Sequence, residues 1–130
     1  IGNDLIIPAP TRKALRSMSA PGTAYKNDPH LQSDPQPDHV KNKYKGSADD
    51  HGVHVNSGIP NHAFYTTAMQ LGGHSWERAG KIWYDALLTL GPTADFAQCK
   101  QATLSAAAAR YGVGSKEAKA VADGWKKVGL

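Results

Sequence analysis

The chain has 130 residues, enough for one compact domain or for part of a larger one. Hydrophobic residues make up 40% of it, and its apolar runs are far shorter than the ~20 residues that span a membrane, so we expect no membrane partner. The formal net charge is +4, but Tyr44 is the only aromatic residue that lies within a basic stretch. Nucleic-acid grooves interleave basic residues with aromatic ones, so we expect no nucleic-acid partner and keep nucleic-acid binding as a minor alternative.

Residues 1–57 form the first of two predicted regions, and their sequence is irregular. They are rich in Pro, Gly, Asp, Asn and Lys, and four prolines between positions 21 and 37 exclude a regular helix there. Such a segment is typical of a functional loop region or of one that a partner orders. The first residues contain no initiator Met and no signal-peptide pattern, so we expect a chain cut out of something longer.

Residues 58–130 predict four helices in succession. The expected spans are about 60–71, 76–90, 94–111 and 116–128, with Ser57, Ser75, Thr93 and Ser115 as N-caps. Short connections make neighbouring helices antiparallel. The predicted fold class is therefore mainly α, with an irregular Pro- and Gly-rich region (1–57) followed by a small antiparallel helical bundle (58–130).

Helical spacing of apolar residues predicts what the bundle buries. In the second helix the apolar positions are Trp76, Ala79, Ile82, Trp83, Ala86, Leu87 and Leu90. We expect core packing for the aromatic residues Trp76, Trp83, Tyr84 and Trp125, with a ligand platform as the alternative. The single cysteine, Cys99, excludes an internal disulfide and lies at an apolar helical position. A buried small hydrophobe is the favoured interpretation of Cys99, and a catalytic thiol is the alternative.

The densest group of chemically active residues lies at positions 49–60. None of the six histidines stands in an H-E-x-x-H motif, and one cysteine gives no zinc-finger spacing. Carboxylates beside a histidine can fix its tautomer, and a metal site made of Asp49, His51 and His54 is a minor alternative. From residue chemistry alone, a polar turn that leads into a helix remains the simpler interpretation.

Five segments, in order, resemble a known family. The string G-V-H-V-N-S-G-I at 52–59 resembles the signature G-V-H-[IV]-N-S-G-I of thermolysin-like zinc metallopeptidases. Similar strings are L-R-S-M at 15–18, G-K-I-W-Y-D-A-L at 80–87, T-A-D-F-A at 93–97 and A-D-G-W-K-K-V-G at 122–129. The segment 71–77 is similar to the protealysin-like branch. The resemblance covers nearly the whole chain and implies the C-terminal domain of a thermolysin-family zinc metalloendopeptidase.

The resemblance implies roles for particular residues. His54 matches the histidine that donates a hydrogen bond to the oxyanion, and Asp49 matches the carboxylate that orients it. Arg16 matches the arginine that binds the substrate carbonyl beyond the scissile bond. The apolar residues that match walls of the pocket for the residue after that bond are Leu15, Leu5 and Ile1. Leucine-like side chains are therefore expected in that pocket.

The resemblance also implies parts that this chain lacks. The zinc ligands, the general base and part of the substrate site belong to an N-terminal half upstream of residue 1, so this chain alone should be inactive. The expected partners are that half and peptide or protein substrates, and a secreted or exported location is implied. A non-catalytic binding or structural module with the same fold is the alternative. Asn3 replaces an acidic calcium ligand and Lys13 an aspartate, which leaves at most a weak calcium site at Asn3.

Overall fold

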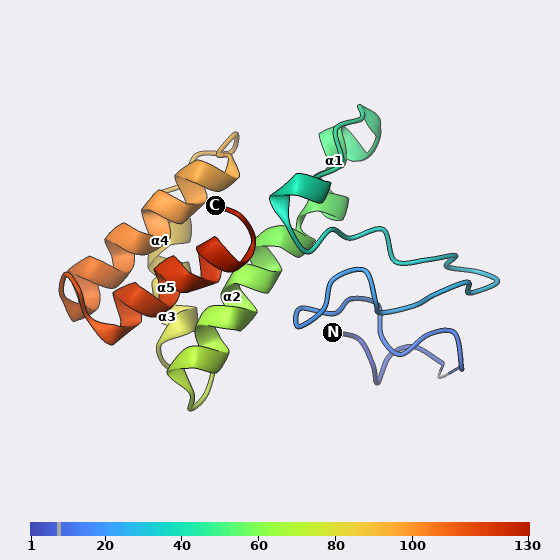
Figure 1. The fold of residues 1–130 in the computed structure, drawn as a ribbon, viewed down its shortest axis with the longest axis horizontal. Helices are drawn as coiled ribbons and strands as arrows, with labels where there is room; N and C mark the ends of the chain where they lie inside the picture. Colours follow the sequence, from blue (N-terminus) through green and yellow to red (C-terminus); the bar gives the residue numbers. More distant parts are fainter. Residues whose placement is uncertain (8) are drawn as a thin grey trace. The chain divides into compact units, whose positions relative to one another are not determined.

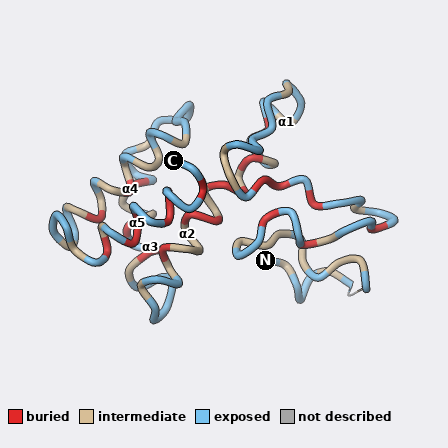
Figure 2. The backbone as a smooth tube through the Cα atoms, in the orientation of Figure 1, coloured by how far each residue is buried: buried red, intermediate tan, exposed pale blue. Residues whose placement is uncertain are grey.

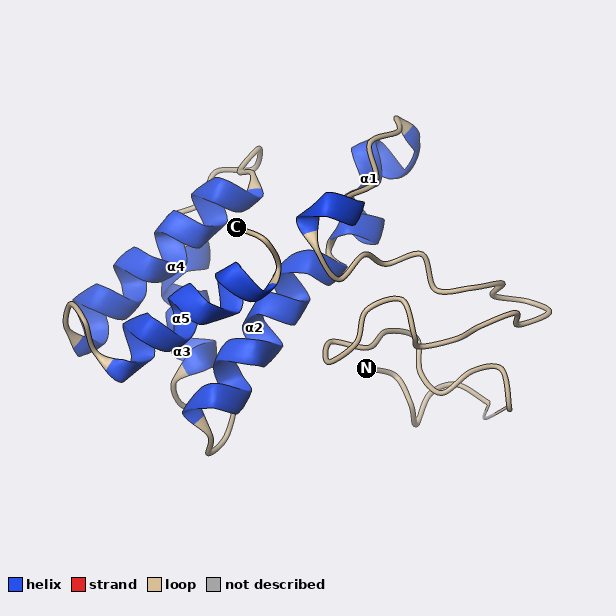
Figure 3. Ribbon diagram, viewed as in Figure 1, coloured by secondary structure: helices blue, strands red, loops and turns tan. Residues whose placement is uncertain are grey.

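The computed structural model describes residues 1–7 and 9–130. In chain order its helices are η1 (Val40–Asn42), α1 (Ala48–Asn56), α2 (Gly58–Leu71), α3 (Ala79–Leu87), α4 (Phe96–Tyr111) and α5 (Lys116–Lys127) (Figure 1). In this described part the chain forms isolated bridges, such as Arg12 with Tyr25, and no strand (Figure 3). The predicted mainly α fold is confirmed. The chain divides into two compact units, Ile1–His62 and Ala63–Leu130.

The core of the second unit lies between its helices (Figure 2). Its most buried apolar residues are Ala63, Ala79, Ile82, Ala86, Ala107, Ala120, Val121, Trp125 and Val128. Thr103, in the middle of α4, accepts a hydrogen bond of 2.8 Å from the indole nitrogen of Trp125, near the end of α5. Because only a short connection joins α4 to α5, this contact shows that the two helices run antiparallel.

Helices α2 and α5 approach closely because Gly124 has no side chain. A methyl group there would lie 2.6 Å from the carbonyl oxygen of Ala63 and would overlap the hydroxyl of Thr67. That hydroxyl donates to the carbonyl of Ala63 on its own helix and lies 3.2 Å from the carbonyl of Ala120 on α5. The packing therefore depends on a glycine facing a small polar residue.

The second predicted helix begins later than expected. α3 starts at Ala79, and Ser75 is not its N-cap, because residues 74–78 form turns in which the carboxylate of Glu77 accepts from the amide of His74. Trp76, which lies outside α3, is 68% exposed and stacks on the His74 ring at 4.4 Å. The core prediction was wrong for Trp76.

Other details of the predicted helices were confirmed or corrected. The core prediction was wrong for Tyr84 and Leu87, which are exposed, and it was confirmed for Trp125. The third helix begins at Phe96 with Asp95 as its N-cap, instead of at 94 after Thr93. Ser115 caps α5 as predicted, with its side chain accepting from the amide of Ala118. The single cysteine, Cys99, is half-buried, and burial raises the pKa of its thiol.

Two aspartates give the first unit its order, because irregular backbone needs partners for its N–H groups. Asp28 accepts from the main-chain amides of His30 and Leu31 and from the hydroxyl of Thr11. These hydrogen bonds, led by the one from the Leu31 amide, lower the pKa of Asp28 to about 2. Asp34 accepts from three amides in the same way, at positions 22, 24 and 36.

Candidate functional site

The candidate site begins at a left-handed turn. For the segment 49–60, residue chemistry alone favoured a polar turn that leads into a helix, and the structure places residues 49–52 inside α1 with φ between 45° and 82°. Residues other than glycine rarely adopt this left-handed backbone conformation, which costs them ~1–2 kcal/mol each. The buried Gly52 adopts it without this cost because glycine has no Cβ. Three non-glycine residues, Asp49, Asp50 and His51, carry the strain.

Asn56 holds the strained turn in place. Its side chain accepts from the amide of Tyr44 at 2.8 Å and donates to the Tyr44 carbonyl at 3.1 Å and to the His51 carbonyl at 3.5 Å. Asn56 is only 3% exposed, so these hydrogen bonds are shielded from water. A locally unfavourable backbone persists where the surrounding structure compensates for it, and Asn56 provides that compensation here.

The left-handed turn brings the Asp49 carboxylate onto His54. Oδ1 of Asp49 lies 2.6 Å from Nδ1 of His54, and Oδ2 accepts from the amides of His54 and Val55, both at 2.9 Å. The amide of Val55 and then the His54 ring lower the pKa of Asp49 below its usual value. The His54 side chain is 77% exposed. Asp49 therefore fixes the direction of an imidazole whose other nitrogen, Nε2, is not used in that pairing.

Arg16 and Gln36 reach the same residue from elsewhere in the first unit. Nη1 of Arg16 donates to the His54 carbonyl at 3.0 Å and to Oγ of Ser57 at 3.1 Å. Nε2 of Gln36 donates to the same two oxygens, at 2.9 Å and 3.1 Å. The sequence pointed to Arg16, but it gave no signal for Gln36, which lies in a proline-rich loop, and it predicted Ser57 only as a helix cap.

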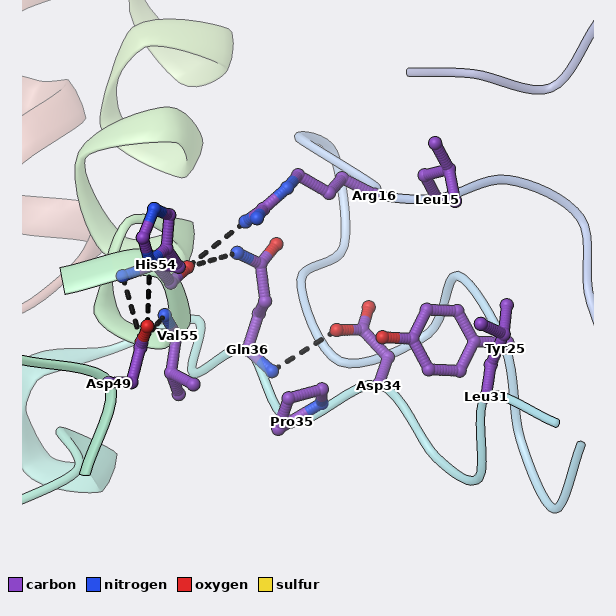
Figure 4. Close-up of a pocket in the computed structure, with 10 residues that line it drawn as sticks. All are labelled: Leu15, Arg16, Tyr25, Leu31, Asp34, Pro35, Gln36, Asp49, His54 and Val55. Atoms are coloured by element: carbon purple, nitrogen blue, oxygen red, sulfur yellow. Dashed lines mark hydrogen bonds and ion pairs between the residues drawn. The ribbon is translucent and has the colours of Figure 1, made fainter. Parts of the chain in front are cut away.

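These residues border a pocket of about 340 Å³ (Figure 4). Its lining consists of Leu15, Arg16, Tyr25, Leu31, Asp34, Pro35, Gln36, Asp49, His54 and Val55. Of the three apolar wall residues that the resemblance implied, Leu15 is in this lining. The other two are not: Leu5 is 86% exposed, and Ile1 pairs through its main chain with Leu15 and Arg16. The sequence did not predict Tyr25, Leu31 and Pro35 as wall residues.

The described residues do not gather a metal site. Across residues 1–7 and 9–130 no three His, Cys, Asp or Glu side chains are placed to hold a metal ion. Both carboxylate oxygens of Asp49 are engaged by Val55 and His54, so a metal site built on Asp49, His51 and His54 does not fit the geometry. Asn3 donates to the neighbouring Asp4 side chain.

The whole chain matches a known family. Residues 1–130 match the family described as "Thermolysin metallopeptidase, alpha-helical domain". The chain belongs to this family. It is 47% identical over 132 residues to an "Extracellular metalloprotease" of Pectobacterium carotovorum subsp. carotovorum, and 38% identical over 138 residues to a "Thermolysin" of Alicyclobacillus acidocaldarius subsp. acidocaldarius. The alignments cover 100% of this chain but only 37% and 23% of those relatives.

A solved structure gives the same result. The precursor of protealysin, a metalloproteinase from Serratia proteamaculans, superposes with a TM-score of 0.90 at 47% sequence identity. The match covers 100% of this chain and 40% of that one. The predicted recognition of a thermolysin-family, protealysin-like C-terminal domain is confirmed. In the part of the chain that the structure describes, no helix is long and apolar enough to cross a membrane.

Proposed function

We propose that this chain forms one wall of the active site of a zinc metalloendopeptidase, in which His54 stabilises the oxyanion and Arg16 binds substrate. The observation that carries the proposal is the 2.6 Å pairing of Asp49 with Nδ1 of a largely exposed His54. A histidine held this way presents Nε2 in a fixed direction. Membership of a family whose relatives are named metalloproteases supplies the reaction class.

The chemistry of His54 follows from its two ring nitrogens. When water attacks a peptide carbonyl, negative charge develops on the oxygen, and a donor already aimed at that oxygen stabilises the transition state more than the ground state. An imidazole that donates from Nδ1 to Asp49 can also donate from Nε2 only when it is protonated. Asp49 is a carboxylate with a lowered pKa and stays ionised at neutral pH, so it can accept the hydrogen bond from Nδ1 of His54.

Arg16 provides the second part of the proposed function. Its guanidinium lines the pocket, and one nitrogen is held by two neutral oxygens, the His54 carbonyl and Ser57 Oγ. An arginine has five N–H donors in a rigid fork, so donors remain for a substrate carbonyl. Leu15, Leu31 and Pro35 give the pocket apolar walls. We propose that the pocket takes an apolar, leucine-like side chain from the residue after the scissile bond.

The rest of the active site is proposed to lie outside this chain. Zinc, which would polarise the scissile carbonyl and activate water, requires ligands that the described residues do not provide, so we place it in an N-terminal half of the same enzyme. That half, together with peptide or protein substrates, is the proposed partner. Because the relative from Pectobacterium is named an extracellular metalloprotease, we propose a secreted location. We expect no peptidase activity from residues 1–130 alone.

The decisive experiment replaces His54 in the complete protease. We expect His54→Ala to lower kcat by about 10²–10³, as for the loss of one oxyanion donor, with a smaller effect on KM. His30→Ala is the matched control, because His30 is an exposed histidine outside the left-handed turn and its ring makes none of the described site contacts. Active-site titration with a tight inhibitor gives kcat per folded site. A His54→Ala enzyme within threefold of the wild type would refute the proposal and favour a non-catalytic binding or structural role.

A further inference from the structure

Gln36 is a buried residue with only one end of its side chain paired. The residue is 6% exposed, and its Nε2 donates to the His54 carbonyl and to Ser57 Oγ. Its Oε1 is buried and has no hydrogen-bond partner among the described residues. A buried acceptor without a partner destabilises a protein, so such an arrangement needs a reason.

The orientation of this amide follows from its neighbours. The His54 carbonyl can only accept, and the Ser57 hydroxyl already donates its single proton to that carbonyl at 2.7 Å. Both neighbours of Gln36 are therefore acceptors, and only its nitrogen can face them. If the amide were turned over, two acceptors would face a third oxygen. Oε1 is thus left unpaired because Nε2 must face the His54 carbonyl and the Ser57 hydroxyl.

The His54 carbonyl is where three side chains converge. It accepts from Ser57 Oγ at 2.7 Å, from Gln36 Nε2 at 2.9 Å and from Arg16 Nη1 at 3.0 Å. Asp49 meanwhile holds the amide and the ring of the same residue. Figure 4 shows Gln36 and Arg16 reaching this carbonyl from two different loops. His54 is therefore held at its amide, its ring and its carbonyl.

The backbone of Gln36 is itself held by hydrogen bonds. Its amide donates to Oδ1 of Asp34, whose other oxygen accepts from the amides of Gly22 and Ala24. Asp34 is 8% exposed. On the other side, Cβ of Gln36 lies 3.0 Å from the position that a methyl group on Gly58 would take. The Gln36 side chain therefore joins a backbone held by Asp34 to the His54 carbonyl.

We propose that Gln36 is a positioning residue, which holds the main chain of His54 so that the imidazole keeps its direction toward the substrate. This inference rests on the proposed role of His54. Gln36 acts through its hydrogen bond to the His54 carbonyl. Arg16 keeps its own bonds to the same two oxygens, so the effect of Gln36 should fall on kcat more than on KM.

The test is Gln36→Met in the complete protease, assayed per titrated active site. Methionine fills a similar volume without the donor and without the unpaired oxygen. We expect kcat to fall roughly fivefold, the equivalent of one neutral hydrogen bond of ~1 kcal/mol, while KM changes less than twofold. Thermal stability should be equal to or higher than that of the wild type, which a purely structural role would not give. Gln36→Glu keeps the shape but faces the carbonyl with an oxygen, and should lose more activity than Gln36→Met.

A double-mutant cycle separates the possible outcomes. If Gln36 acts through the imidazole, Gln36→Met should change kcat less than 1.5-fold once His54 is alanine. An equal loss in both backgrounds, or an unchanged kcat for Gln36→Met with His54 intact, would overturn the inference and leave the proposed role of His54 standing. An unchanged kcat for His54→Ala alone would refute the proposed function itself. If Gln36→Met yields too few titratable sites, the same cycle with Gln36→Glu decides.

Discussion

Gly52→Ala is the substitution that best tests whether the left-handed turn supports the site. Gly52 has φ of 82° and is buried at the end of the strained segment that begins at Asp49. A methyl group on it would lie 2.6 Å from Cδ1 of Tyr44 and 2.7 Å from Nδ2 of Asn56. The substitution therefore strains the backbone and pushes against the amide that holds the turn in place.

The expected magnitude is the sum of two terms. A side chain in the left-handed region costs ~1–2 kcal/mol, and overpacking against fixed neighbours costs ~1–3 kcal/mol. The sum is about 2–5 kcal/mol, and the lower bound corresponds to roughly 30-fold easier opening of the turn. The amides of His54 and Val55 report this opening, because both donate to Asp49 and lose their acceptor when the turn opens.

Amide hydrogen exchange in the complete protease provides the assay. We expect the His54 and Val55 amides to exchange at least 30-fold faster in Gly52→Ala, with kcat reduced as the Asp49 contact loosens. Gly114→Ala is the matched control, since Gly114 has φ of 76° but nothing within 4 Å of an added methyl group. It should leave these two amides unchanged. Exchange within twofold of the wild type in Gly52→Ala would refute the link between the turn and the site.

Two further predictions concern the rest of the fold. Gly124→Ala should destabilise the second unit by about 1–3 kcal/mol despite the better helix propensity of alanine, because its methyl group overlaps Thr67 and the Ala63 carbonyl. Denaturant unfolding followed by tryptophan fluorescence measures this loss. A stabilised variant would contradict the prediction. The folded-state pKa of Asp28 is about 2, below its ordinary value of 3.8, so its stabilisation is fully present above about pH 4 and is lost as pH falls through 2. Asp28→Asn should destabilise the first unit at neutral pH and remove the loss of stability between pH 4 and 2. Hydrogen exchange of the Leu31 amide over this pH range measures both effects. A variant with the same pH dependence as the wild type would contradict the role given to Asp28.

Much of the fold is encoded in local sequence. Helical spacing, N-caps and glycine stops act over three to five residues, so the predicted spans 116–128 and 94–111 lie close to α5 (Lys116–Lys127) and α4 (Phe96–Tyr111). The error at α3 has the same origin. Ser75 offers a cap and Trp76 fits the apolar spacing, but hydrogen bonds within 74–78 favour turns, and Trp76 stacks on His74 instead of entering the core.

The candidate site was predictable only in part. Asp49 and His54 are five positions apart, and one recognisable string carries His54, so the sequence itself named this pair and, through a second string, Arg16. The sequence did not show that four consecutive residues adopt left-handed geometry, since three of them are not glycine. That conformation is held by Asn56 and Tyr44, which are 12 positions apart.

By itself the sequence determined the helical class of the fold and the family, and it named Asp49, His54 and Arg16 as candidate site residues, because these depend on short-range patterns and on strings of adjacent residues. Only the tertiary structure decided which groups hold them. Gln36 meets His54 across 18 positions and Arg16 meets it across 38. Such contacts depend on the path of loops ordered by Asp28 and Asp34, whose hydrogen bonds go mainly to backbone amides. Backbone amides are present at every position other than proline, so a sequence does not show which of them an aspartate will bind.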